Sequence, residues 1–141
     1  MIEEPRVTES PLADPDLLGY YDPDSHLIVL RKGLCDADRR CTEEHERLHA
    51  ELGHRGDLVD VYGFDPFVVE QQEERANRRA ARRLIAFADL MRMRLLYPDD
   101  PSQAADELGV NLETLETRVR WLSRHEKDEL NRAIYERGEV A

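Results

Sequence analysis

Two histidines spaced four residues apart, in the motif His45-Glu46-x-x-His49, are the first residues that point to chemistry. Thr42 can cap a helix that runs to about Gly53, and on this helix the two histidines share one face. Two imidazoles in an otherwise apolar stripe need partners, and a shared Zn²⁺ supplies one. Glu46 lies beside that face, where it can accept a proton from a water activated by the metal. The motif therefore predicts a zinc site with Glu46 as catalytic base, against the alternative of a solvated helix that happens to carry two histidines.

A catalytic zinc usually needs a third protein ligand, and His54 is the nearest candidate. Only a break in the helix at Gly53 would turn His54 towards His45 and His49. The metzincin pattern does not fit, because it requires Gly at position 52 and His at position 55, where this chain has Leu and Arg. We therefore expect His54 at the surface or supporting a ligand rather than on the metal.

Glu73 is the better candidate for the third ligand. A helix predicted from Pro66, after the cap Asp65, to about Leu96 places Glu73 in the middle of an apolar stripe. Metal ligation would satisfy the otherwise costly buried carboxylate; pairing with an arginine or a backbone amide is the alternative. The neighbouring Glu74 points about 100° away, to the flank of the helix. The predicted ligands are thus His45, His49 and Glu73, and the arginines on the other side of the helix form a solvated face: Arg75, Arg78, Arg79, Arg82 and Arg83.

The elements that must position these residues predict an α+β fold. Residues 1–17 are rich in proline and acidic groups, and we expect a flexible arm there. Residues 18–97 form a predicted zincin-like metallopeptidase core with a short antiparallel sheet, in which Leu18–Lys32 is a hairpin with its turn at residues 22–25. The core also contains the histidine helix, the long helix that supplies Glu73, and a short strand over residues 58–62.

Residues 98–141 are predicted to form a helical tail. Its three helices follow Asp100-Pro101, the cap Asn111 and the capping box that starts at Ser123, and the first two have the spacing of a helix-turn-helix. The outward-facing carboxylates Glu113 and Glu116 would meet DNA phosphates badly. We therefore expect the tail to serve as a structural or protein-docking unit, with Trp121 packed between the tail and the core.

With these residues identified, the chain resembles the ImmA/IrrE family of metallopeptidases over roughly residues 20–135. The similar features run in order from a strand at residues 26–30, through Arg39-Arg40 and the His-Glu-x-x-His motif, to Glu73-x-x-Ala76-Asn77 and the tail segments 105–110 and 115–118. In that family two histidines and a downstream glutamate hold zinc, and the glutamate after the first histidine is the base. Matching position by position assigns these roles to His45, His49, Glu73 and Glu46. The chain departs from the family pattern at Arg47, Leu48, Arg79 and Ala86.

The resemblance implies a zinc-dependent endopeptidase that cleaves a helix-turn-helix transcriptional repressor of a phage, mobile element or stress response, and so relieves repression. His54 and Tyr62 are candidates for supporting a ligand or steadying the oxyanion, and Tyr20, Tyr21 and His26 are equally open for the second role. The alternative function is a non-catalytic, zinc-containing regulator that binds a repressor or DNA through its tail.

The composition limits the kinds of binding partner and the cellular location that we expect. The 141-residue chain has a net charge of -11 and a pI near 4.9, which disfavours nucleic acids and anionic membranes as main partners. Because no apolar run is long enough to span a bilayer and the N-terminal residues do not resemble a secretion leader, we expect a cytoplasmic protein. Cys35 and Cys41 lie six residues apart and are expected to be unpaired thiols.

Overall fold

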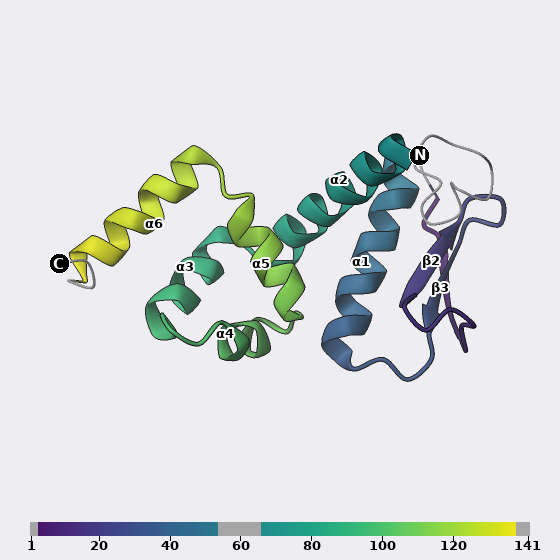
Figure 1. Ribbon diagram of the computed structural model, residues 1–141, viewed down its shortest axis with the longest axis horizontal. Helices are drawn as coiled ribbons and strands as arrows, with labels where there is room; N and C mark the ends of the chain where they lie inside the picture. The colour runs from purple at the N-terminus through teal and green to yellow at the C-terminus, as the bar shows by residue number, and fades with distance from the viewer. Residues whose placement is uncertain (1–2, 54–65, 138–141) are drawn as a thin grey trace.

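A small three-stranded sheet lies at one end of the molecule and helices make up the rest, so the fold is α+β as predicted (Figure 1). The computed structural model describes residues 3–53 and 66–137. The strands lie in the order β1-β3-β2, and the predicted hairpin is confirmed because β2 and β3 pair antiparallel. Ile28 and Leu30 of the central strand are fully buried. The strands are β1 (Arg6–Ser10), β2 (Gly19–Asp22) and β3 (Leu27–Arg31).

The expectation of a flexible arm over residues 1–17 is wrong for the middle of this segment. Residues 6–10 form β1, which pairs parallel with β3, so the sheet is mixed rather than antiparallel. Val7 packs against the buried residues of the sheet. The segment after β1 is held by Arg31, whose guanidinium donates hydrogen bonds to the backbone carbonyls of Leu12, Asp14 and Leu17. Most β1 side chains are exposed, and this is why the strand lacks the apolar alternation that reveals one.

The histidine helix, α1 (Asp36–Leu52), begins earlier than the predicted cap Thr42. Cys35 is the N-cap, and its Sγ accepts a hydrogen bond from the backbone N–H of Asp38 at 3.5 Å. Cysteine is not among the preferred capping residues, so Thr42 gives the stronger sequence signal. The predicted end of the helix is confirmed, since Gly53 adopts the left-handed conformation with φ 71° that glycine accommodates best.

The long helix predicted over residues 65–96 is in fact two helices, α2 (Pro66–Leu84) and α3 (Phe87–Leu96). The chain leaves the helix at Ile85, and Ala86 has the extended conformation of an N-cap. The Ile85 carbonyl accepts a hydrogen bond from Arg118 Nε at 2.9 Å. Arg118 is buried and forms an ion pair of 2.8 Å with Glu126, which also accepts hydrogen bonds from Arg82 at 3.0 Å. A side chain 33 residues further along the chain thus binds the carbonyl at the break.

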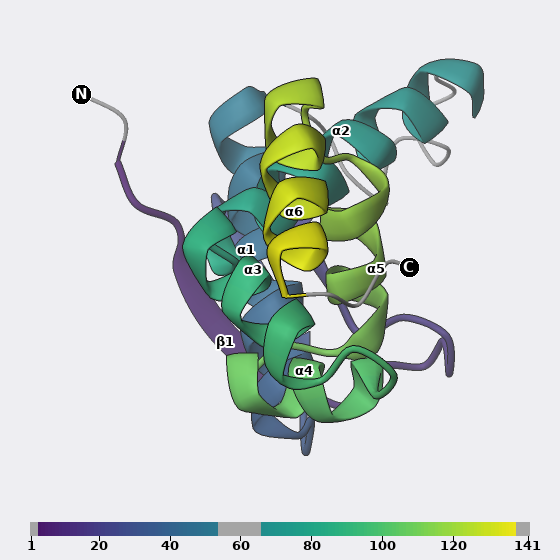
Figure 2. The same ribbon diagram turned by 90° about the vertical axis from the view of Figure 1, so that its left-hand side faces the viewer.

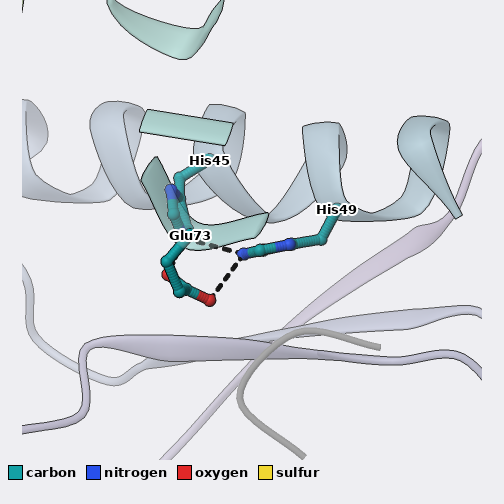
Figure 3. A group of neighbouring side chains, drawn as sticks. All are labelled: His45, His49 and Glu73. Atoms are coloured by element: carbon teal, nitrogen blue, oxygen red, sulfur yellow. Dashed lines mark hydrogen bonds and ion pairs between the residues drawn. The ribbon is translucent and has the colours of Figure 1, made fainter. Parts of the chain in front are cut away.

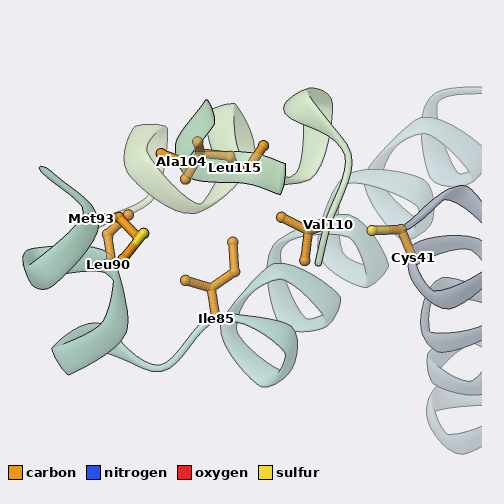
Figure 4. Close-up of a cluster of buried hydrophobic side chains, with 8 residues drawn as sticks. Cys41, Ile85, Leu90, Met93, Ala104, Val110 and Leu115 are labelled. Carbon is orange, nitrogen blue, oxygen red and sulfur yellow. The ribbon is translucent and has the colours of Figure 1, made fainter. Parts of the chain in front are cut away.

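The helices of the tail begin where predicted. Asp100 and Asn111 cap their helices through their side chains, Gly109 ends the first helix, and Ser123 forms the predicted capping box. Buried side chains from residues 104–115 form one core with Ile85 and α3, which also includes Cys41 of α1, pointing towards Val110 (Figure 4). Viewed from the end away from the sheet, α6 lies in front of α1 and α2 (Figure 2). The helices are α4 (Pro101–Leu108), α5 (Leu112–Arg120) and α6 (Arg124–Glu136).

The arginines of α2 were predicted to form a solvated face, but two of them contact neighbouring elements. Arg83 forms ion pairs with Glu44 and Glu51 of α1, at 3.2 and 2.6 Å. Arg78 lies 4.2 Å from the centroid of the Trp121 ring, a cation–π contact between α2 and the end of α5.

The expected strand at residues 58–62 lies outside the described residues. No helix in the described ranges is long and apolar enough to span a bilayer.

Replacing Arg118 by Met should lower the free energy of unfolding by about 2–3 kcal/mol, because the Ile85 carbonyl and Glu126 both lose a buried donor. Arg82 remains to compensate part of the carboxylate charge. Urea unfolding followed by circular dichroism measures the change. Arg120→Met, on an exposed position of the same helix, is the matched control and should change stability by less than about 0.5 kcal/mol; equal effects of the two substitutions would contradict the proposed role of Arg118.

The same interaction predicts a dependence on pH. Hydrogen bonding from Arg118, opposed by partial burial, lowers the pKa of Glu126 from 4.5 to about 2. A carboxyl whose pKa is lower in the folded state stabilises the fold fully above its ordinary pKa, and this contribution disappears as pH falls through the folded-state value. The stability difference between the wild type and Glu126→Gln should therefore be constant above about pH 5 and shrink between about pH 4.5 and 2. A difference that grows on acidification would be inconsistent with this assignment.

Candidate metal centre

The close packing of α1 on α2 brings the candidate ligands together. Leu48 of α1 and the small residues Ala76 and Ala80 of α2 form one buried cluster, and the small side chains allow the helices to approach. Glu73 lies about one turn before Ala76 on the same face of α2. Its carboxylate therefore points at the face of α1 that carries the two histidines (Figure 3).

Three ligand atoms from two helices converge at this point. His45 Nε2 and His49 Nε2 are 3.0 Å apart, and the Glu73 carboxylate oxygens lie 3.0 Å from His45 Nε2 and 2.9 Å from His49 Nε2. The imidazole rings are nearly perpendicular, at 86°. The grouping predicted from the helical wheel is thus present in the structure. Within residues 3–53 and 66–137, Glu73 pairs with the two histidines and not with an arginine or a backbone amide.

The spacing and chemistry of these donors fit a zinc ion. Tetrahedral zinc holds nitrogen and oxygen ligands at about 2.0–2.1 Å, which places neighbouring ligand atoms roughly 3.3 Å apart. The two histidine nitrogens are 3.0 Å apart, and a different Glu73 oxygen lies 2.9–3.0 Å from each of them, distances near this value. Two imidazoles and one carboxylate are a ligand set that zinc hydrolases use, with a fourth position left for water or substrate. His45, His49 and Glu73 are thus compatible with a bound zinc ion.

The protonation state of Glu73 also suits metal binding. Burial raises the pKa of its carboxyl, but hydrogen bonds and charge interactions with His45 and His49 outweigh this effect and hold the pKa well below its ordinary range. The carboxylate is consequently ionised at neutral pH, which is the form that binds a cation.

Glu46 lies next to the ligands without joining them. Its side chain is buried, with the residue only 1% exposed, and its Oε1 is 3.9 Å from His45 Nε2. On the helix it follows the first histidine directly, so it borders the group of ligand atoms from one side. A carboxylate in this position can accept a proton from a water near the three ligand atoms.

A cleft of about 190 Å³ opens beside His45 and Glu46. One side is formed by residues 17–19 before and at the start of β2, and another by α5 of the tail; Asn77 of α2 also faces it. A volume below the roughly 300–1,000 Å³ of small-molecule sites suits a side chain or a short piece of polypeptide. The contribution of α5 was missed from the sequence, because no local pattern links Asn111, Glu113, Thr114 and Thr117 to residues 70 positions earlier.

The remaining candidates are either elsewhere or outside the described residues. His54 and Tyr62 fall in the segment 54–65, which the structure does not describe. His26 forms a hydrogen bond with the Tyr21 hydroxyl through Nδ1, at 2.8 Å, at the turn of the hairpin. His26, Tyr21 and Tyr20 are not among the described residues that line the cleft.

The ligand assignment predicts that Glu73→Ala weakens zinc binding by more than about 100-fold, beyond the 10–100-fold documented for groups that merely support a ligand. Competition with a chromophoric chelator measures the affinity. Glu74→Ala removes the adjacent, exposed carboxylate and should leave zinc binding unchanged. Loss of zinc in the Glu74 variant with retention in the Glu73 variant would refute the assignment.

Comparison with known proteins agrees with this geometry. The family model of the IrrE N-terminal-like domain, a peptidase family, matches residues 3–120. No curated protein matches the chain in sequence. The matched region contains the whole of the candidate centre and the two helices α4 and α5. The type of activity that the family implies is that of a metallopeptidase, and the chain belongs to the IrrE N-terminal-like domain family.

Proposed function

We propose that this protein is a zinc-dependent endopeptidase that cleaves a helix-turn-helix transcriptional repressor and so relieves repression. The observation that carries the proposal is the convergence of His45, His49 and Glu73 beside the buried Glu46, at the edge of an open cleft. Family membership supports the peptidase class, and the resemblance to ImmA/IrrE peptidases supports the repressor as substrate.

In the proposed reaction, His45, His49 and Glu73 hold the metal. When bound, zinc supplies Lewis acidity, which polarises the scissile carbonyl and lowers the pKa of water towards about 7. Glu46 accepts a proton from the attacking water at its carboxylate and returns it to the nitrogen of the leaving amine. The cleft positions the peptide beside Glu46, and burial of that carboxylate keeps competing solvent away from it.

We assign separate roles to the two parts of the chain. Residues 18–97, together with β1, act as a zincin-like catalytic core, and the helices α4, α5 and α6 form a helix-turn-helix-like tail that packs on it. Glu113 and Glu116 are exposed on α5, which supports a role of the tail towards protein rather than nucleic acid.

The catalytic proposal predicts that Glu46→Gln retains stoichiometric zinc but loses about 10²–10⁴-fold in kcat, the usual contribution of a general base. A pool of quenched fluorescent peptides reports hydrolysis and metal analysis reports zinc. Glu51→Gln, on an exposed position of the same helix, should keep both. Undiminished hydrolysis by the Glu46 variant would overturn the mechanism.

The substrate is tested separately. Zinc-loaded wild type and Glu46→Gln are incubated with purified helix-turn-helix repressors from the same genome, and products are identified by mass spectrometry. The proposal predicts one defined cut in a repressor with the wild type and none with the variant. Hydrolysis of peptides without cleavage of any repressor would leave the enzyme class standing and reject the repressor as substrate.

A further inference from the structure

The tail is bound directly to the helix that carries the histidines. Arg40 Nη1 of α1 donates hydrogen bonds to the backbone carbonyls of Leu108 and Gly109, at 3.0 and 3.2 Å. The side chain of Asn111 donates to Asp38 Oδ1 of α1 at 3.1 Å. These contacts hold the turn between α4 and α5 against the first half of α1. The position of α5 relative to His45 is consequently fixed.

Because α5 is fixed in this way, its first two turns form a wall of the cleft beside Glu46. Glu113, Thr114 and Thr117 line the cleft from α5, whereas His45 and Glu46 line it from α1. The Thr117 hydroxyl donates to the Glu113 backbone carbonyl at 2.9 Å, so it is already engaged within the helix. The Glu113 side chain is the charged group that α5 contributes to the cleft, and it is exposed.

The carboxylates that line the cleft offer a partner for a cationic side chain. Among the described residues that line it, Glu46 and Glu113 carry carboxylates, and none is a lysine or an arginine. Glu46 borders the metal ligands, which leaves Glu113 as the carboxylate available to a substrate side chain. Apolar atoms of Leu17, Leu18 and Ala80 line the same space. An apolar lining with a carboxylate on one wall matches a side chain with an aliphatic stem and a cationic head.

We propose that Glu113 is a specificity-determining residue, which selects polypeptide segments that carry a lysine or arginine near the scissile bond. The inference rests on the proposed peptidase function for the meaning of the cleft. It adds a role for the tail, because the tail helix α5, and not the zinc-binding helices, supplies the selecting group.

The test measures binding without cleavage. Fluorescein-labelled octapeptide pools, randomised except for one central residue fixed as Arg, norleucine or Glu, are titrated into zinc-loaded, full-length Glu46→Gln protein, and anisotropy is recorded. The Arg pool should bind roughly two- to fivefold more tightly than the norleucine pool, the range expected for an exposed ion pair. This preference should shrink at high ionic strength.

Adding Glu113→Gln should abolish the preference for the Arg pool, and Glu113→Lys should reverse it in favour of the Glu pool. Glu116→Gln is the matched control, since it removes an exposed carboxylate of the same helix that does not line this cleft. The inference is overturned if the affinity does not depend on the fixed residue, if no pool binds, or if Glu116→Gln has the same effect.

Hydrolysis of the pools by the wild type is measured in parallel. Arg-selective binding that depends on Glu113, without hydrolysis, would reject the peptidase function and keep the binding preference.

Discussion

The close approach of α1 and α2 is the contact on which the rest of the structure depends. Leu48 fits against two alanines of α2, Ala76 and Ala80, and larger residues there would push the helices apart. One turn away, the same approach brings the Glu73 carboxylate within 3.0 Å of both imidazoles. Packing of apolar side chains thus sets the separation of the ligand atoms. The same packing also places the ionised Glu73 carboxylate against the two histidines.

A second set of contacts determines the shape of the space beside the centre. Arg118 ends α2 by binding the Ile85 carbonyl and holds α6 through Glu126, while Arg40 and Asn111 fasten the start of the tail to α1. Cys41, on the histidine helix, is buried in the core of the tail. The tail and the helices that carry the candidate ligands therefore share a core, and the cleft lies where they meet. This sharing explains how residues far apart in the sequence line the same side of the candidate centre.

Much of the centre was predictable from the sequence because its signals are local. The spacing of His45 and His49 and the place of Glu73 on a helical wheel depend only on helix geometry within one element. The caps Asp100, Asn111 and Ser123 act within three residues of themselves. The features that were predicted wrongly or not at all depend on residues far away in the sequence. β1 is held by parallel pairing with β3, the break at Ile85 by Arg118, and the wall of the cleft by contacts between α1 and the tail.

The central claim is that two histidines and Glu73 hold zinc without help from a thiolate, although two free cysteines lie on or next to the same helix. X-ray absorption at the zinc edge of the loaded protein tests this most directly. The account predicts only nitrogen and oxygen neighbours, at about 2.0–2.2 Å. A sulfur neighbour at about 2.3 Å would contradict it, because it would place Cys35 or Cys41 on the metal.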